Sequence, residues 1–198
     1  MAALADGFGL LERAVSYALA SAQLVTPELL PRATPCAGWD LRLLLCHVGE
    51  SLDALREGLA TRRVGPGTTP PEGAVPADVV AGLRRSAARL LGACAAVPGD
   101  PVIAIADREM TASVLAAAGA IEIGVHGWDI SVACGSRRPI PPALADSMLR
   151  IAPLLIPRGS RDGLFADPVP APALASPGDR LVAFLGRDPK RPAAPRPG

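Results

Sequence analysis

The chain has 198 residues, which is enough for one domain with a full core and a short appendage. Its 20 basic and 19 acidic residues give a formal net charge of +1, which argues against nucleic acid or an anionic membrane surface as a partner. Hydrophobic residues make up 49% of the chain and aromatic residues only 3%, a mixture that suits closely packed helices better than sheets. We therefore expect an all-α fold.

Two long helices are predicted in the first third of the chain. From Phe8 to Val25, apolar residues recur at spacings of three and four, which is the period of an amphipathic helix. The proline-rich stretch TPELLPRATPCAGW then interrupts regular structure and ends at Asp40, a residue type that caps helices. A second helix is predicted from about Leu41 to about Leu59.

Two further helices are predicted in the middle of the chain. The loop VGPGTTPPEGAVP leads into a helix that begins at Asp78 or Pro76 and reaches about Ala96. A short extended piece, VIAIA, precedes an alanine-rich helix over residues 111–133, and Cys134-Gly135 is a usual signal for the end of a helix.

The C-terminal part of the chain is predicted to be an extension on the helical bundle. PPALADSMLRIAPLLIP supplies a fifth, shorter helix, and SPGDRLVAFLGRDP a capped helical turn that docks onto the bundle. The organisation predicted is a bundle over residues 1–156, a packed extension over 157–189 and a disordered tail over 190–198.

The sequence also indicates a cellular compartment. The four cysteines are scattered without a CxxC pair, so neither a zinc ribbon nor a disulfide framework is expected. The apolar stretches are shorter than the about 18 to 20 residues of a membrane span, and the N-terminus lacks the basic start of a signal peptide. We expect a soluble, cytoplasmic protein with reduced cysteines.

The alanine-rich helix carries a possible metal site. Glu122 and His126 are four residues apart and therefore project from the same face of that helix. The chain's only other histidine, His47, lies in the middle of the second predicted helix. Two imidazoles and a carboxylate are a familiar ligand set for zinc with one open position. The alternative is that both histidines are core residues bonded to backbone carbonyls, with Glu122 paired to an arginine.

Asp129, one turn beyond His126, has several possible roles. It is either a surface carboxylate, a partner for Arg137 or Arg138, an acceptor behind a metal ligand, or a general base. We select it as the candidate catalytic residue.

A few other residues are singled out, each with a plainer alternative. Cys36 is either a reactive thiol near the site or a small packed residue in its loop. Trp39 and Trp128 are either pocket walls or packing anchors. Arg42 could meet a substrate or cofactor, although solvated charge is the simpler interpretation, and the same holds for Arg137 and Arg138.

Three stretches in this order resemble a known family. TPCAGWDLRLLLCHVGE and EIGVHGWDISVACG are similar to two signatures of the mycothiol-dependent maleylpyruvate isomerase family, within the DinB-like superfamily of metal-binding four-helix bundles. SPGDRLVAFLGRDP is similar to a C-terminal signature of its actinobacterial members. The resemblance covers nearly the whole chain and implies a DinB-like four-helix bundle with a short C-terminal extension.

The resemblance also implies a function. It implies a divalent metal, zinc above all, bound by His47, Glu122 and His126, and mycothiol as the co-substrate. A thiolate can add to an electrophilic small molecule and leave, which gives cis-trans isomerisation, or stay attached, which gives thiol transfer. A shorter segment follows the fifth helix here than in the founding isomerase, so transfer to another electrophile is as open as isomerisation of maleylpyruvate.

Two other functions remain as alternatives. One is a hydrolase in which the metal activates a water and Glu122 or Asp129 steers it. The other is a bundle that binds metal or a small molecule without catalysis. The sequence alone does not identify the metal, because imidazole and carboxylate ligands also accept nickel, iron or manganese.

Overall fold

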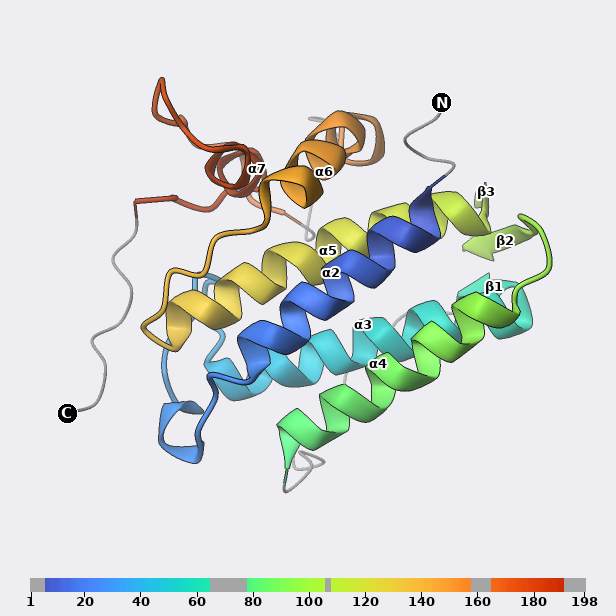
Figure 1. Cartoon of the computed structure of the whole chain (residues 1–198), viewed down its shortest axis with the longest axis horizontal. Helices are drawn as coiled ribbons and strands as arrows, with labels where there is room; N and C mark the ends of the chain where they lie inside the picture. Colours follow the sequence, from blue (N-terminus) through green and yellow to red (C-terminus); the bar gives the residue numbers. More distant parts are fainter. Residues whose placement is uncertain (1–5, 65–77, 106–107, 158–164, 191–198) are drawn as a thin grey trace.

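Four long helices form the body of the protein. The computed structural model describes residues 6–64, 78–105, 108–157 and 165–190. The four helices lie side by side along the long dimension of the molecule (Figure 1): α2 (Gly7–Ala22), α3 (Leu41–Thr61), α4 (Val79–Ala96) and α5 (Ala112–Ala133). The expected all-α helical bundle is confirmed, and each predicted helix is present with ends shifted by at most a few residues.

Helix α5 is the central element of the bundle. Of its 22 residues 19 are buried, including an unbroken run from Ile123 to Ala133. A helix that is apolar on all sides is stable only when other elements surround it. Helix α2 packs along one side of α5, and α3 lies along another. Polar side chains on α5 are therefore held inside the molecule.

The predicted start signals cap three of the helices. The Asp40 side chain accepts a hydrogen bond from the Leu43 backbone N–H at 2.8 Å, and Asp78 accepts one from Ala81 at 2.8 Å. Thr111 does the same at the start of α5. Such caps satisfy backbone donors that have no partner within the helix. They explain why α3, α4 and α5 begin where the sequence predicts.

The loop between α2 and α3 folds back on the bundle. It contains a short 3-10 helix, η1 (Pro27–Leu29), and an isolated antiparallel bridge between Ala33 and Asp40. The Thr34 hydroxyl donates to the carbonyl of Trp39 at 3.0 Å, which closes the turn that carries Cys36 and Trp39. This turn holds both side chains beside α3 and α5.

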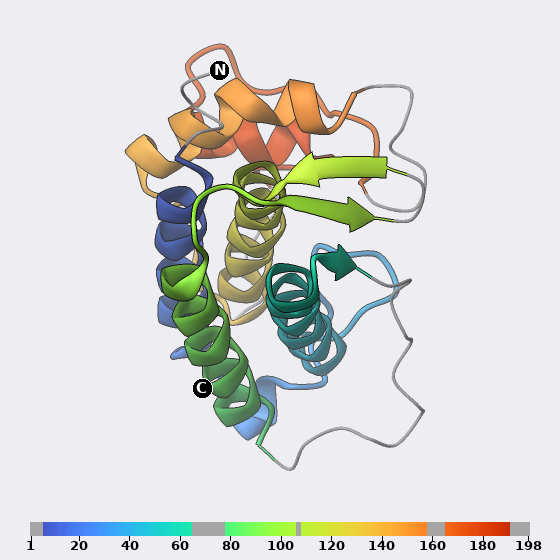
Figure 2. The ribbon, with the colours of Figure 1, turned by 90° about the vertical axis from the view of Figure 1, so that its right-hand side faces the viewer.

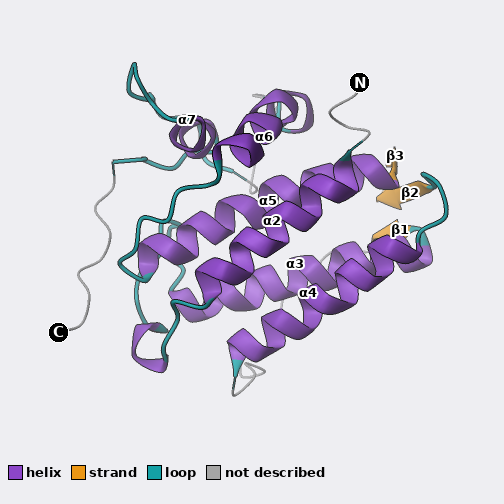
Figure 3. Ribbon diagram, in the orientation of Figure 1, coloured by secondary structure: helices purple, strands orange, loops and turns teal. Residues whose placement is uncertain are grey.

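A small sheet at one end of the bundle was only partly predicted. It contains β1 (Arg63–Val64), β2 (Val102–Ile105) and β3 (Arg108–Thr111) in that order, with β1 parallel to β2 and β2 antiparallel to β3. Figures 2 and 3 show the three strands at the end of the bundle where α3 and α4 finish. The predicted extended piece VIAIA is β2.

Two shorter helices lie across the bundle at the top of Figure 1. They are α6 (Pro142–Leu155) and α7 (Pro177–Phe184), which pack against each other. The Ser176 side chain caps α7 by accepting from Asp179, as the SPGD sequence indicates. The segment boundaries at 156 and 189 stay predictions, and residues 191–198 of the predicted tail lie outside the described residues.

The structure also bears on two further expectations, about the cysteines and about membrane-spanning helices. Cys36, Cys46, Cys94 and Cys134 are all free, which agrees with the expected reduced state. Among the described helices, none has the length and apolarity needed to cross a membrane.

Candidate metal centre

Two imidazoles converge on one carboxylate between α3 and α5. The Nε2 atom of His47 lies 2.8 Å from Oε1 of Glu122, and the Nε2 atom of His126 lies 3.0 Å from the same oxygen. The two imidazole centroids are 5.1 Å apart, with ring planes at 86°. Within the described segments neither histidine bonds to a backbone carbonyl, and Glu122 pairs with both of them rather than with an arginine, so the alternative interpretation is wrong.

The packing of α3 against α5 brings these residues together. Gly119 of α5 has no side chain, and a Cβ built there would lie 2.6 Å from a methyl group of Leu55 of α3, so the two helices approach closely at this point. Leu55 faces Gly119 while His47 faces Glu122, so residue numbers rise along α3 as they fall along α5. The helices are antiparallel, which places a histidine near the start of α3 opposite the second half of α5.

The centre is open on one side and closed on the other. The side chains of His47 and Glu122 are 32% and 27% exposed, whereas that of His126 is 6% exposed. The Trp39 ring lies against His47, with centroids 4.6 Å apart, and also reaches toward His126 at 6.3 Å. A ligand can therefore approach from solvent along Glu122 and His47, beside the Trp39 ring.

A buried ion pair lies behind His126. The Nδ1 atom of His126 is 3.0 Å from Oδ2 of Asp129, which is fully buried. The Arg187 guanidinium contacts both carboxylate oxygens, with Nη2 3.0 Å from Oδ2 and Nε 3.4 Å from Oδ1. The buried position excludes a surface carboxylate, and the predicted partners Arg137 and Arg138 are wrong, because Arg187 holds this position.

The charged groups of the centre lower the pKa values of Glu122 and Asp129 and raise the pKa of His126. Burial would raise the pKa of Glu122, but the charges and hydrogen bonds of His126 and His47 together outweigh burial and hold this pKa below its ordinary value. Burial would lower the pKa of His126, but Glu122 and the hydrogen bond to Asp129 raise it well above its ordinary value. Burial would likewise raise the pKa of Asp129, but Arg187 lowers it. This raised pKa favours the imidazolium form of His126, whose ring lies between the carboxylates of Glu122 and Asp129.

A second group of possible metal ligands shares His126. Its ligand atoms are Cys36 Sγ, His126 Nδ1 and a carboxylate oxygen of Asp129, with Cys36 Sγ 3.3 Å from Oδ2. The Arg187 guanidinium lies 3.0 Å from Asp129 and 3.5 Å from Cys36, so a metal ion there would be next to a fixed positive charge. The group of His47, Glu122 and His126 is the better candidate.

Sequence reasoning missed Arg187. This residue follows α7, is only 9% exposed, and also donates from Nη1 to the Leu185 carbonyl at 2.8 Å. The Phe165 ring lies 5.8 Å from its Cζ atom. The GRDP end of the C-terminal signature was the only available signal, since no spacing rule connects Arg187 to Asp129, 58 residues earlier.

The remaining singled-out residues divide between the centre and its surroundings. Cys36 and Trp39 lie at the centre, whereas Trp128 is a core residue with 5% exposure. Arg42 is exposed on α3. Arg137 donates to the Pro189 carbonyl at 2.6 Å, and the Arg138 carbonyl accepts from Tyr17 at 2.7 Å.

The donor set fits a divalent metal ion. The ligand atoms of His47, Glu122 and His126 lie within 4.8 Å of one another, and each ligand atom belongs to a type that zinc accepts. Three protein ligands with one open side are typical of catalytic rather than structural zinc sites. Fold and site together define a helical bundle with a candidate metal centre between two of its helices.

A comparison with protein families identifies the family of this bundle. The family model described as the mycothiol maleylpyruvate isomerase N-terminal domain matches residues 11–131, which is more than half of the chain. The chain belongs to this family. No curated protein and no solved structure matches it. The matched segment contains His47, Glu122 and His126, while Arg187 lies beyond its end.

Proposed function

We propose that the protein is a zinc-dependent enzyme that activates a low-molecular-weight thiol, mycothiol, for reaction with an electrophilic small molecule. The observation that carries this proposal is the convergence of His47, Glu122 and His126 at a point that solvent reaches from one side. Membership of the mycothiol maleylpyruvate isomerase family supports the identity of the thiol. A divalent metal with an open position lowers the pKa of a bound thiol, so that the thiolate nucleophile forms near neutral pH.

The residues of the centre have different roles in the proposed reaction. His47 and Glu122 are the exposed ligands beside which the thiol approaches, and the Trp39 ring closes one flank of this approach. Asp129 accepts the Nδ1–H of His126, which would leave Nε2 available as the metal ligand. Asp129 has no exposed side-chain surface, so we propose a positioning role in place of the catalytic role predicted from the sequence.

The reaction class follows from the chemistry of thiolates. The thiol proton leaves to solvent, and a sulfur–carbon bond forms at an activated double bond of the substrate. If the sulfur–carbon bond breaks again after rotation about the former double bond, the result is cis-trans isomerisation. If it persists and the carbanion takes up a proton, the result is thiol transfer.

The decisive experiment measures thiol binding with and without metal. Zinc-loaded protein is expected to bind mycothiol in a calorimetric titration, and chelator-treated protein is expected to lose this binding. His47→Ala is expected to behave like the chelated protein. Equal thiol binding by the chelated and loaded forms would contradict the proposal.

A second measurement separates thiol chemistry from hydrolysis. Turnover of an activated electrophile by zinc-loaded protein is expected to depend on added mycothiol. Turnover that survives the complete removal of low-molecular-weight thiol would instead identify a hydrolase.

A further inference from the structure

A small cavity lies at the far end of the bundle from the metal centre. It has a volume of about 290 Å³, and the ends of α3 and α4 and the segment that follows α4 line it. Leu59 in its wall is twelve residues beyond His47 on α3, so the cavity begins about 18 Å from the centre at 1.5 Å per residue. The cavity is therefore separate from the candidate active site.

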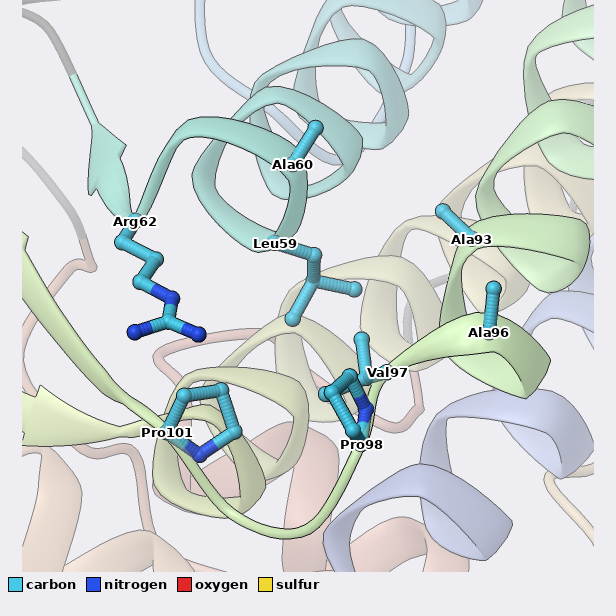
Figure 4. Close-up of a pocket in the computed structure, with 8 residues that line it drawn as sticks. All are labelled: Leu59, Ala60, Arg62, Ala93, Ala96, Val97, Pro98 and Pro101. Atoms are coloured by element: carbon cyan, nitrogen blue, oxygen red, sulfur yellow. The ribbon is translucent and has the colours of Figure 1, made fainter.

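The lining of the cavity is apolar except at one point. The apolar residues among the described lining are Leu59, Ala60, Ala93, Ala96, Val97, Pro98 and Pro101. Arg62 is the one charged residue among the described lining residues, and Figure 4 shows its side chain at the edge of the labelled group, extending from the end of α3 toward Pro101. A mostly apolar wall with a small number of polar groups is the usual composition of a small-molecule site.

The Arg62 guanidinium has no polar partner within the described residues. None of the hydrogen bonds or ion pairs of the described segments involves its side chain, in contrast to Arg89 on α4, which pairs with Asp53 at 3.0 Å. Asp100 immediately precedes the lining residue Pro101 in the sequence. Its carboxylate accepts a hydrogen bond from the Ser113 backbone N–H at 2.8 Å. Arg62 is exposed to solvent, so its guanidinium is accessible to an incoming ligand.

The backbone at Arg62 is also unusual. Arg62 ends α3 in the left-handed conformation with φ 58°, and it is the only non-glycine residue with positive φ among the described segments. Glycine is the residue that this conformation favours, because a Cβ adds strain there. A strained backbone that carries an unpaired charge toward a cavity is an observation that points to binding.

We propose that this cavity binds a small monocarboxylate with a short apolar chain. The carboxylate would pair with the planar guanidinium of Arg62, which offers two parallel donors, and the chain would lie against Leu59, Val97 and Pro98. This inference does not depend on the proposed function of the metal centre.

Hexanoate is a suitable probe for this site. Titrated into full-length, zinc-loaded protein, it is expected to shift the methyl resonances of Leu59, Ala93 and Val97 in a saturable manner. Hexylammonium, with the same chain and the opposite charge, is expected to bind at least fivefold more weakly. Shifts centred on Leu43, near the metal centre, or equal binding of the two probes would overturn the proposal.

Variants at the end of α3 test the role of the charge. Arg62→Gly removes the guanidinium and relieves the left-handed strain, so it is expected to fold and to weaken hexanoate binding at least fivefold. Arg63→Gln, which removes the neighbouring exposed charge, is expected to leave hexanoate binding unchanged. Hexanoate binding as tight in Arg62→Gly as in the unaltered chain would overturn the proposal, and so would an absence of saturable binding to the unaltered chain.

Discussion

One oxygen atom links the three ligand residues of the candidate centre. Oε1 of Glu122 contacts Nε2 of both histidines, and the second ring nitrogen of His126 faces Asp129. A metal ion that binds these three ligands must therefore replace a proton on His126. Glu122 contributes no further proton, since its pKa is already lowered.

This proton predicts the pH dependence of metal binding. His126 has a raised pKa, so at pH 7 it holds a proton that zinc must displace, and zinc affinity should rise about tenfold per pH unit until the pH passes that raised pKa. Calorimetry at pH 7 in buffers of different ionisation enthalpy is expected to detect the release of about one proton per zinc ion. A binding enthalpy that is the same in every buffer would contradict the protonated state of His126.

The buried pair of Asp129 and Arg187 should be important for stability. Their side chains are 0% and 9% exposed, so Arg187→Ala leaves the buried Asp129 carboxylate with His126 as its remaining cationic partner and is expected to lower the free energy of unfolding by about 3 kcal/mol. Arg180 is the matched control, since it pairs with Asp146 on the surface with both side chains about half exposed. Arg180→Ala should cost less than about 1 kcal/mol.

Urea unfolding of the metal-free protein at pH 7 measures both variants. If Arg187→Ala and Arg180→Ala cost the same, the C-terminal segment does not hold Asp129 in the way that the distances indicate.

At the scale of elements, the close contact of α2 with α5 depends on small residues. A Cβ on Gly127 of α5 would lie 2.9 Å from the Cα atom of Ala18 and equally close to the Tyr17 ring. Backbone atoms of α2 cannot move aside without shifting the whole helix. This packing fixes the turn of α5 that carries both His126 and Asp129.

A pair of glycine substitutions tests this contact. Gly127→Ala is expected to lower the free energy of unfolding by about 1–3 kcal/mol because it overpacks the interface. Gly92→Ala on α4, where nothing lies within 4 Å of the added Cβ, is expected to raise it by up to about 1 kcal/mol. Thermal unfolding followed by circular dichroism compares the two, and equal effects would contradict the packing argument.

The helices could be predicted because their signals are local. Asp40 and Asp78 cap helices whose apolar period is visible in the sequence, and Gly135, with φ 75°, follows the end of α5. The strands β1 and β3 could not be predicted from the sequence, because Arg63–Val64 and Arg108–Thr111 are short and carry charged residues. Their pairing with β2 depends on the way that α3 and α5 bring them together.

The same distinction applies to the site across the whole molecule. Glu122 and His126 could be placed on one face by their spacing, and His47 was the only other histidine available to complete the set. Arg187 could not be placed, because its contact with Asp129 requires the chain to return to the bundle after α6 and α7. The family match ends at residue 131, so this return lies outside the segment that it identifies.

The central claim is that His47, Glu122 and His126 bind one divalent metal ion. Competition with a chelator of known affinity measures the zinc dissociation constant of the full chain and of two matched variants, Glu122→Gln and Glu50→Gln. Glu50 is an exposed carboxylate one turn beyond His47 and outside the ligand group. We predict one zinc ion per chain, a loss of affinity of at least tenfold in Glu122→Gln, and no change in Glu50→Gln. Unchanged affinity in Glu122→Gln would contradict the account.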